Sequence, residues 1–232
     1  MTGSILLSIA LLMSAPADTL RIGDPSLHVL LAAGTDTVDN YVVQGGERRP
    51  LGTSIETRSE IPEGFLIVQE NRGADGTLFS LDSIVVADRT LATVWHGDVT
   101  PTGRRHVVFS DGRMTGVAVD TLGQETSLDA EVPPGLLDYS VFALVANYLP
   151  MSPGYNAVVA TYDIARGAIY VPLEVVAAED VTLGGTTLEA WRMEIHLGAR
   201  SVTRWIERET RREIKWSVAV GDAEMVGERR ND

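Results

Sequence analysis

Two clusters of glutamates supply the residue type on which acid–base catalysis depends. They are Glu56, Glu60 and Glu63, and Glu207, Glu209 and Glu213. A pair of carboxylates on the two sides of one cleft is what glycoside hydrolysis requires. The sequence does not place these clusters on one cleft, and acidic side chains are rarely buried without a partner. We therefore expect solvated strand faces rather than a catalytic pair.

The histidines offer a second candidate chemistry. They are His28, His96, His106 and His196. His96 and His106 flank a turn at residues 101–103 and can face one another across a hairpin near Asp98, an arrangement that could bind a metal ion at the surface. No H-E-x-x-H or similar motif accompanies them, so we predict no metal site. Besides the two non-catalytic functions considered below, a third and less favoured alternative is a hydrolase that uses His96 or His106 with a carboxylate. It would require those side chains to converge in a pocket.

Other catalytic classes lack their motifs. The chain has no cysteine, which excludes thiolate nucleophiles and cysteine-ligated metals. It contains no G-x-S-x-G nucleophile elbow and no glycine-rich phosphate loop. We therefore predict no catalytic residue, no cofactor and no enzymatic activity.

The charge balance argues against a nucleic-acid partner. Acidic residues outnumber basic ones 32 to 19, for a formal charge of −13, whereas nucleic-acid affinity comes mainly from basic residues that neutralise phosphates. Lys215 is the only lysine, so lysine-based covalent catalysis is excluded everywhere else.

The first 17 residues predict a signal peptide. An apolar run from Ile5 to Met13 precedes Ala15-Pro16-Ala17, a small-x-small cleavage pattern. Because this region has no lysine or arginine, a buried N-terminal strand or helix is the alternative. No later apolar run approaches the roughly 20 residues that span a bilayer. We expect an exported protein that does not span the membrane, periplasmic in a two-membrane bacterium and otherwise secreted, with a single β-rich half-barrel domain at 18–232.

The elements that must position any site are predicted to be strands. Asp75-Gly76, Asp111-Gly112 and Gly184-Gly185 lie between strand-like runs and favour two-residue hairpin turns. In "TTLEAWRMEIHLG", apolar and polar residues alternate with period two, which is typical of a strand with one buried face. The pattern predicts two β-meanders, at about 37–120 and 156–228.

The stretch "WIERETRREIKW" at 205–216 carries seven charged residues between two tryptophans. On a helix its apolar residues would form no continuous face. On a hairpin, residues 208–211 form the turn, and Ile214, Trp216 and Val218 share one face of the outgoing strand. We therefore predict a hairpin whose charged side chains point to solvent, rather than a catalytic cluster.

Residues 133–150, "PPGLLDYSVFALVANYLP", are predicted to form the one prominent helix, three to four turns long. It is apolar nearly all round, so it must be covered on several sides, either as the plug of a barrel or against a ligand. The candidate ligand-lining residues are Phe142, Leu144, Tyr148, Trp191 and Met193.

The segments "AWRMEIHLG" and "TRWIERETRREIKWSV", with the phrase Trp205-Ile206-Glu207, resemble the C-terminal end of a family of exported bacterial β-proteins of unknown function. That family is similar to the lipoprotein-carrier (LolA-like) half-barrels. "DYSVFALVANYLPMSPG" resembles its central helix and following loop. The match covers about residues 136–228, and its motifs are structural and degenerate.

The resemblance implies a mainly β fold, in which a curved antiparallel sheet or half-barrel of about ten or more strands wraps one central helix. It also implies non-catalytic binding or transport of a lipid, an acyl chain or another hydrophobic molecule in the cell envelope. The alternative is a structural or assembly protein of the envelope with a solid core. A cavity of roughly 300 Å³ or more would distinguish the two.

Overall fold

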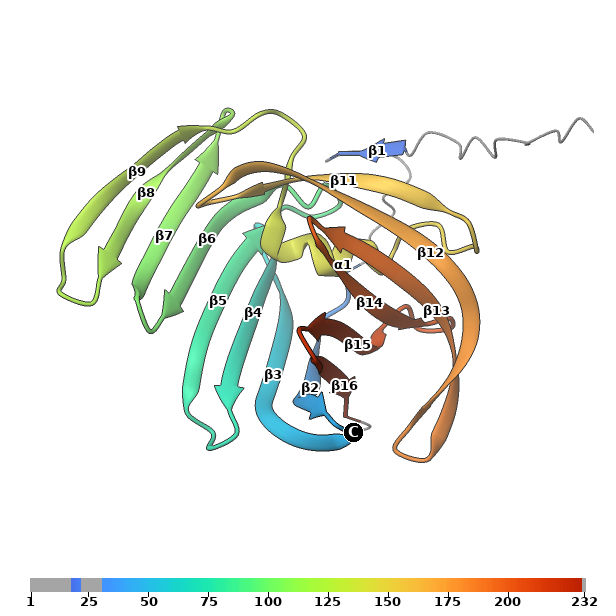
Figure 1. Ribbon diagram of the computed structural model, residues 1–232. Coiled ribbons are helices and arrows are strands. Elements are labelled where there is room, and N and C mark those ends of the chain that lie inside the picture. The colour runs from blue at the N-terminus through green and yellow to red at the C-terminus, as the bar shows by residue number, and fades with distance from the viewer. Residues whose placement is uncertain (1–17, 22–30, 231–232) are drawn as a thin grey trace, which may run out of the picture.

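The computed structural model describes residues 18–21 and 31–230, and the predicted signal peptide at 1–17 lies outside them. In these described segments, sixteen strands belong to one sheet, which confirms the mainly β fold. The sheet is open rather than closed into a barrel. It curves around one short helical segment, α1, which lies in its concavity (Figure 1).

The first meander is antiparallel throughout. Its strands are β2 (Gly34–Gln44), β3 (Glu47–Ile61), β4 (Gly64–Gly73), β5 (Leu78–Val86), β6 (Thr93–Thr100), β7 (Gly103–Ser110), β8 (Arg113–Asp120) and β9 (Glu125–Glu131). The predicted turns at Asp75-Gly76 and Asp111-Gly112 join β4 to β5 and β7 to β8. At the second turn both residues have positive φ, 51° and 73°, which is the conformation that a two-residue hairpin favours.

The second meander is also antiparallel. Its strands are β11 (Asn156–Asp163), β12 (Gly167–Leu183), β13 (Thr186–Leu197), β14 (Arg200–Glu207), β15 (Glu213–Val220) and β16 (Ala223–Arg229). Two short strands, β1 (Asp18–Leu20) and β10 (Leu137–Asp138), pair with β11 in parallel. The predicted turn at Gly184-Gly185 joins β12 to β13.

The two meanders meet where β16 pairs with β2. The strand order therefore runs from β11 through β16 directly to β2 and on to β9. We call the β16–β2 pairing the seam. Because of it, strands from opposite ends of the chain are neighbours at the centre of the sheet.

The helical segment is shorter than the sequence indicates. A 3-10 turn, η1 (Tyr139–Val141), leads into α1 (Phe142–Ala146); a helix over 133–150 was therefore a wrong prediction. Leu137 and Asp138 are held in β10, and Asp138 accepts a 2.8 Å hydrogen bond from the Ser140 N–H, so helical structure begins only there. After α1 the chain tightens, since Asn147 donates its N–H to the Leu144 carbonyl three residues back.

The main apolar core lies between this segment and the sheet. Val141, Val145 and Leu149 are at most 1% exposed, which confirms that the segment is covered on several sides. The predicted buried face of β13 is also confirmed, because Met193 and Ile195 belong to the same core. No helix in the described part of the chain is long and apolar enough to cross a membrane.

Candidate functional site

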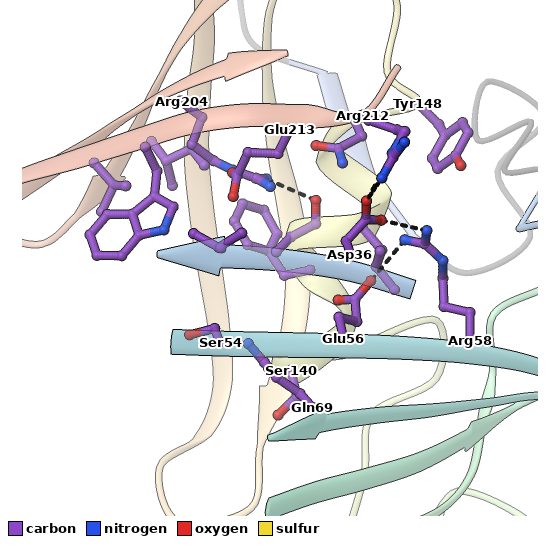
Figure 2. Close-up of a pocket in the computed structure, with 18 of the residues that line it drawn as sticks. Asp36, Ser54, Glu56, Arg58, Gln69, Ser140, Tyr148, Arg204, Arg212 and Glu213 are labelled. Carbon is purple, nitrogen blue, oxygen red and sulfur yellow. Dashed lines mark hydrogen bonds and ion pairs between the residues drawn. The ribbon is translucent and has the colours of Figure 1, made fainter. Parts of the chain in front are cut away.

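A cavity of about 520 Å³ lies between the helical segment and the concave face of the sheet. Its walls come from β2, β3 and β4 on one side of the seam and from β13, β14, β15 and the β14–β15 turn on the other. The helical segment supplies Phe142, Leu144 and Tyr148. The pocket therefore has an apolar wall and a polar wall (Figure 2).

The structure separates the five predicted lining residues into two groups. Phe142, Leu144 and Tyr148 line the cavity. Trp191 and Met193 belong to the same apolar cluster but do not line the cavity. Met193 is fully buried in the core, and Trp191 is half-buried beneath the guanidinium of Arg208, 4.7 Å from the ring centre.

An ion-pair network forms the polar wall. Arg58 of β3 donates to Asp36 of β2 at 2.6 Å and to Glu56 at 2.8 Å. Arg212, from the turn after β14, also donates to Asp36, across the seam. Figure 2 shows these side chains converging on Asp36.

Within the network, the pKa of Asp36 is lowered and the pKa of Glu56 is raised. Burial alone would raise the pKa of Asp36, but hydrogen bonds from Arg212 and Arg58 outweigh it and hold that pKa below its usual range. For Glu56 burial dominates the attraction of Arg58 and raises the pKa. Burial also raises the pKa of Tyr148, which lines the same cavity.

A second buried arginine connects the sheet to the helical segment. Arg204 of β14 is 6% exposed, pairs with Glu213 of β15, and donates a 2.8 Å hydrogen bond to the Ala143 carbonyl. Its guanidinium is therefore satisfied within the wall of the cavity. This contact fixes α1 against the second meander.

The charged stretch at 205–216 is a hairpin, as predicted, but its charges do not all face solvent. Arg211, Arg212 and Glu213 line the cavity. A bulge opposite Trp205–Ile206 breaks the alternation, so Ile214 packs in a separate cluster with Trp205 while Trp216 lines the cavity. The predicted common face for Ile214 and Trp216 is wrong, because the extra residue reverses the side-chain order.

One glutamate of each cluster reaches the cavity, namely Glu56 and Glu213. The expectation that both clusters are only solvated strand faces is therefore wrong for these two residues. Each carboxylate is already paired with an arginine, Glu56 with Arg58 and Glu213 with Arg204. Both glutamates therefore belong to the ion pairs of the polar wall.

His96 and His106 do not form a joint site. His96 of β6 pairs with Val107 in register, and His106 of β7 pairs with Gly97, so the two side chains point to opposite faces of the sheet. His96 is 4% exposed and His106 is exposed. His96 and His106 therefore do not converge in one pocket.

His96 instead binds carboxylates. Its Nδ1 is 3.0 Å from Asp138, which precedes η1, and its Nε2 is 3.4 Å from Asp82 of β5. Burial would lower the pKa of His96, but the hydrogen bonds with Asp138 and Asp82 outweigh it and raise the pKa to about 9. The protonated ring therefore links the start of the helical segment to β5 and β6.

Potential metal-binding atoms of Asp82, His96 and Asp98 lie within 4.8 Å of one another. Arg105 already donates to Asp98 at 2.6 Å, and the raised pKa of His96 favours a proton over a metal on the ring. The residues as arranged satisfy one another, and we assign no metal to them.

Comparison with known proteins identifies the family but not an activity. Residues 40–227 match the model of a family described as a protein of unknown function, DUF3108, and the chain belongs to that family. A crystal structure of the hypothetical lipoprotein YmcC from Escherichia coli (K12) aligns with 83% of this chain and 86% of its own. The identity is 9% and the TM-score is 0.28, a level at which the likeness says nothing about function. No curated protein matches the sequence.

Proposed function

We propose that this protein binds an acyl chain or a similar hydrophobic molecule in the cavity between α1 and the sheet, without catalysis. The observation that carries the proposal is the cavity itself, about 520 Å³ with an aromatic and aliphatic wall. Pockets that enclose a drug-sized ligand have volumes of roughly 300–1,000 Å³.

The same cavity counts against the alternative of an envelope scaffold with a solid core. A scaffold needs no internal space, and protein interiors are normally packed without voids larger than a water molecule. Here Phe142, Leu144 and Tyr148 line a cavity of about 520 Å³. A hydrocarbon chain bound there would cover the apolar part of this lining from water, which is favourable.

A carrier role in the cell envelope is part of the proposal. It rests on the predicted signal peptide and on the resemblance to the lipoprotein-carrier (LolA-like) half-barrels, in which a curved sheet wraps a lipid-binding cavity. In that role, the open sheet and short helical segment would shield one hydrocarbon chain from water during transfer.

Mass spectrometry of the gently purified protein tests the proposal by identifying any co-purified lipid. A variant that fills the cavity gives the structural control. Ala143 lines the cavity with an exposed side chain, so Ala143→Trp should abolish lipid retention while leaving the fold intact.

Leu122→Trp is the matched control, because Leu122 is 80% exposed in the β8–β9 turn and does not line the cavity. It should retain lipid like the natural chain. If the natural protein carries no lipid and, once stripped, binds neither fatty acid nor phospholipid, the proposed function is wrong.

A further inference from the structure

The polar wall of the cavity contains more basic than acidic side chains, which is the opposite of the balance in the whole chain. Acids outnumber bases 32 to 19 overall. Among the described residues that line the cavity, the arginines outnumber the carboxylates: Arg58, Arg204, Arg211 and Arg212 face Asp36, Glu56 and Glu213. One net positive charge in the wall of a cavity favours an anionic ligand there, although the whole protein has a formal charge of −13.

Arg211 is the cation responsible for the excess. The other three arginines are paired with carboxylates of the wall. In the described part of the chain Arg211 has no ion-pair partner, and its one side-chain hydrogen bond is a long contact of 3.4 Å to the Leu149 carbonyl. A guanidinium that lines a half-enclosed cavity without a carboxylate is available to a ligand.

The backbone at Arg211 supports this assignment. Its φ is 61°, in the left-handed region that glycine or asparagine adopts at lower cost. The turn is closed by hydrogen bonds from the Arg211 N–H to the Glu207 carbonyl and from the Glu207 N–H to the Arg212 carbonyl. This closed turn places the Arg211 side chain at the cavity wall.

A second polar group near the end of α1 also lacks a partner. Asn147 lines the cavity and is 7% exposed, and its Oδ1 is buried without a hydrogen bond to any described residue. Unsatisfied buried polar atoms are uncommon. A side-chain amide presents an acceptor on one side and two donors on the other, so after rotation it can donate to an anion held by Arg211.

We propose that the ligand is a single-chain anionic amphiphile, whose hydrocarbon chain contacts Phe142 and Leu144 and whose head group is bound by Arg211, with Asn147 beside it. This deepens the proposed function and rests on it. The shared head-group chemistry is a carboxylate or a phosphate monoester.

Calorimetric titration of the delipidated full chain at pH 8 and low salt tests the inference with three ligands of equal chain length. They are decanoate, decyl phosphate and the uncharged decanol. At least one anion should bind about tenfold tighter than decanol or better, since charge-assisted hydrogen bonds contribute at least that factor. The tighter anion identifies the head group as carboxylate or phosphate.

Variants of Arg211 locate the head group. Arg211→Gln should lose the preference for the anion and leave decanol affinity unchanged, whereas Arg211→Lys should retain most of it. Arg208→Gln is the matched control from the same turn, because Arg208 pairs with Glu189 and lies over Trp191 outside the cavity. It should bind all three ligands like the natural chain.

The outcomes separate this inference from the proposed function. Equal affinity for decanol and both anions overturns the head-group assignment and leaves hydrophobic binding intact. Retention of the anion preference in Arg211→Gln, at an unchanged unfolding temperature, also overturns it. If none of the three ligands binds, both the inference and the proposed function are wrong.

Discussion

Deprotonating His96 should destabilise the folded protein by about 3 kcal/mol. The ring is 4% exposed and bonded to Asp138 and Asp82, and its pKa rises from the ordinary 6.5 to about 9. Each pKa unit corresponds to about 1.4 kcal/mol of preference for the protonated form. Because the ring is buried, solvent screening reduces this contribution little.

The direction of the pH dependence follows from the raised pKa. The unfolded chain releases the His96 proton near pH 6.5, and the folded chain holds it to about pH 9. The stabilisation is therefore complete below pH 6.5, declines as the pH rises, and is lost above pH 9. Other titrating groups are cancelled by comparing the natural chain with His96→Gln.

Urea unfolding at half-unit intervals from pH 6 to pH 10 provides the measurement. The difference in unfolding free energy between the natural chain and His96→Gln should shrink by about 3 kcal/mol across that interval. An NMR titration should place the His96 ring near pH 9. A constant difference across the range, or a ring that titrates near 6.5, would refute the assignment of a buried imidazolium.

Three further substitutions test the walls of the cavity. Asp36→Asn should lower the unfolding free energy by about 1–3 kcal/mol, because Arg58 and Arg212 both lose their shared carboxylate. Glu56→Gln should be neutral or stabilising at pH 7 in the same urea assay, because burial already disfavours the charge of Glu56. A larger loss of stability in Glu56→Gln than in Asp36→Asn would contradict the network. Gly227→Ala should displace the Trp216 indole, because an added Cβ would collide with Nε1 of the ring. We expect a shifted tryptophan emission spectrum and an unfolding free energy lower by about 1–3 kcal/mol. An unchanged spectrum would contradict the contact.

The turns and strand faces were predictable because they depend on local rules. Asp111-Gly112 and Gly184-Gly185 both adopt the positive φ that their composition favours. On β12, the buried Val171, Leu173 and Val175 alternate with the exposed Pro172 and Glu174. Backbone sterics and period-two burial are written in adjacent residues, so a single sequence is sufficient to identify them.

The polar wall was not predictable, because it depends on which strands become neighbours. Nothing in "WIERETRREIKW" shows that a bulge turns Glu213 inward, or that Arg212 meets Asp36 from β2. The length of α1 was predicted wrongly for the same reason, because Leu137 and Asp138 pair with β11 instead of joining the helix. The one local signal was the excess of arginine in a turn of an otherwise acidic chain.

The seam has a consequence for the order of assembly. Asp36 and Arg212 are 176 positions apart, yet they belong to one wall of the cavity. Contacts between such distant positions form late and slowly, because a long loop must close before they contribute. During synthesis, one edge of β2 stays unpaired until β16 emerges, so the two sides of the cavity cannot come together in a nascent chain that lacks its last strand.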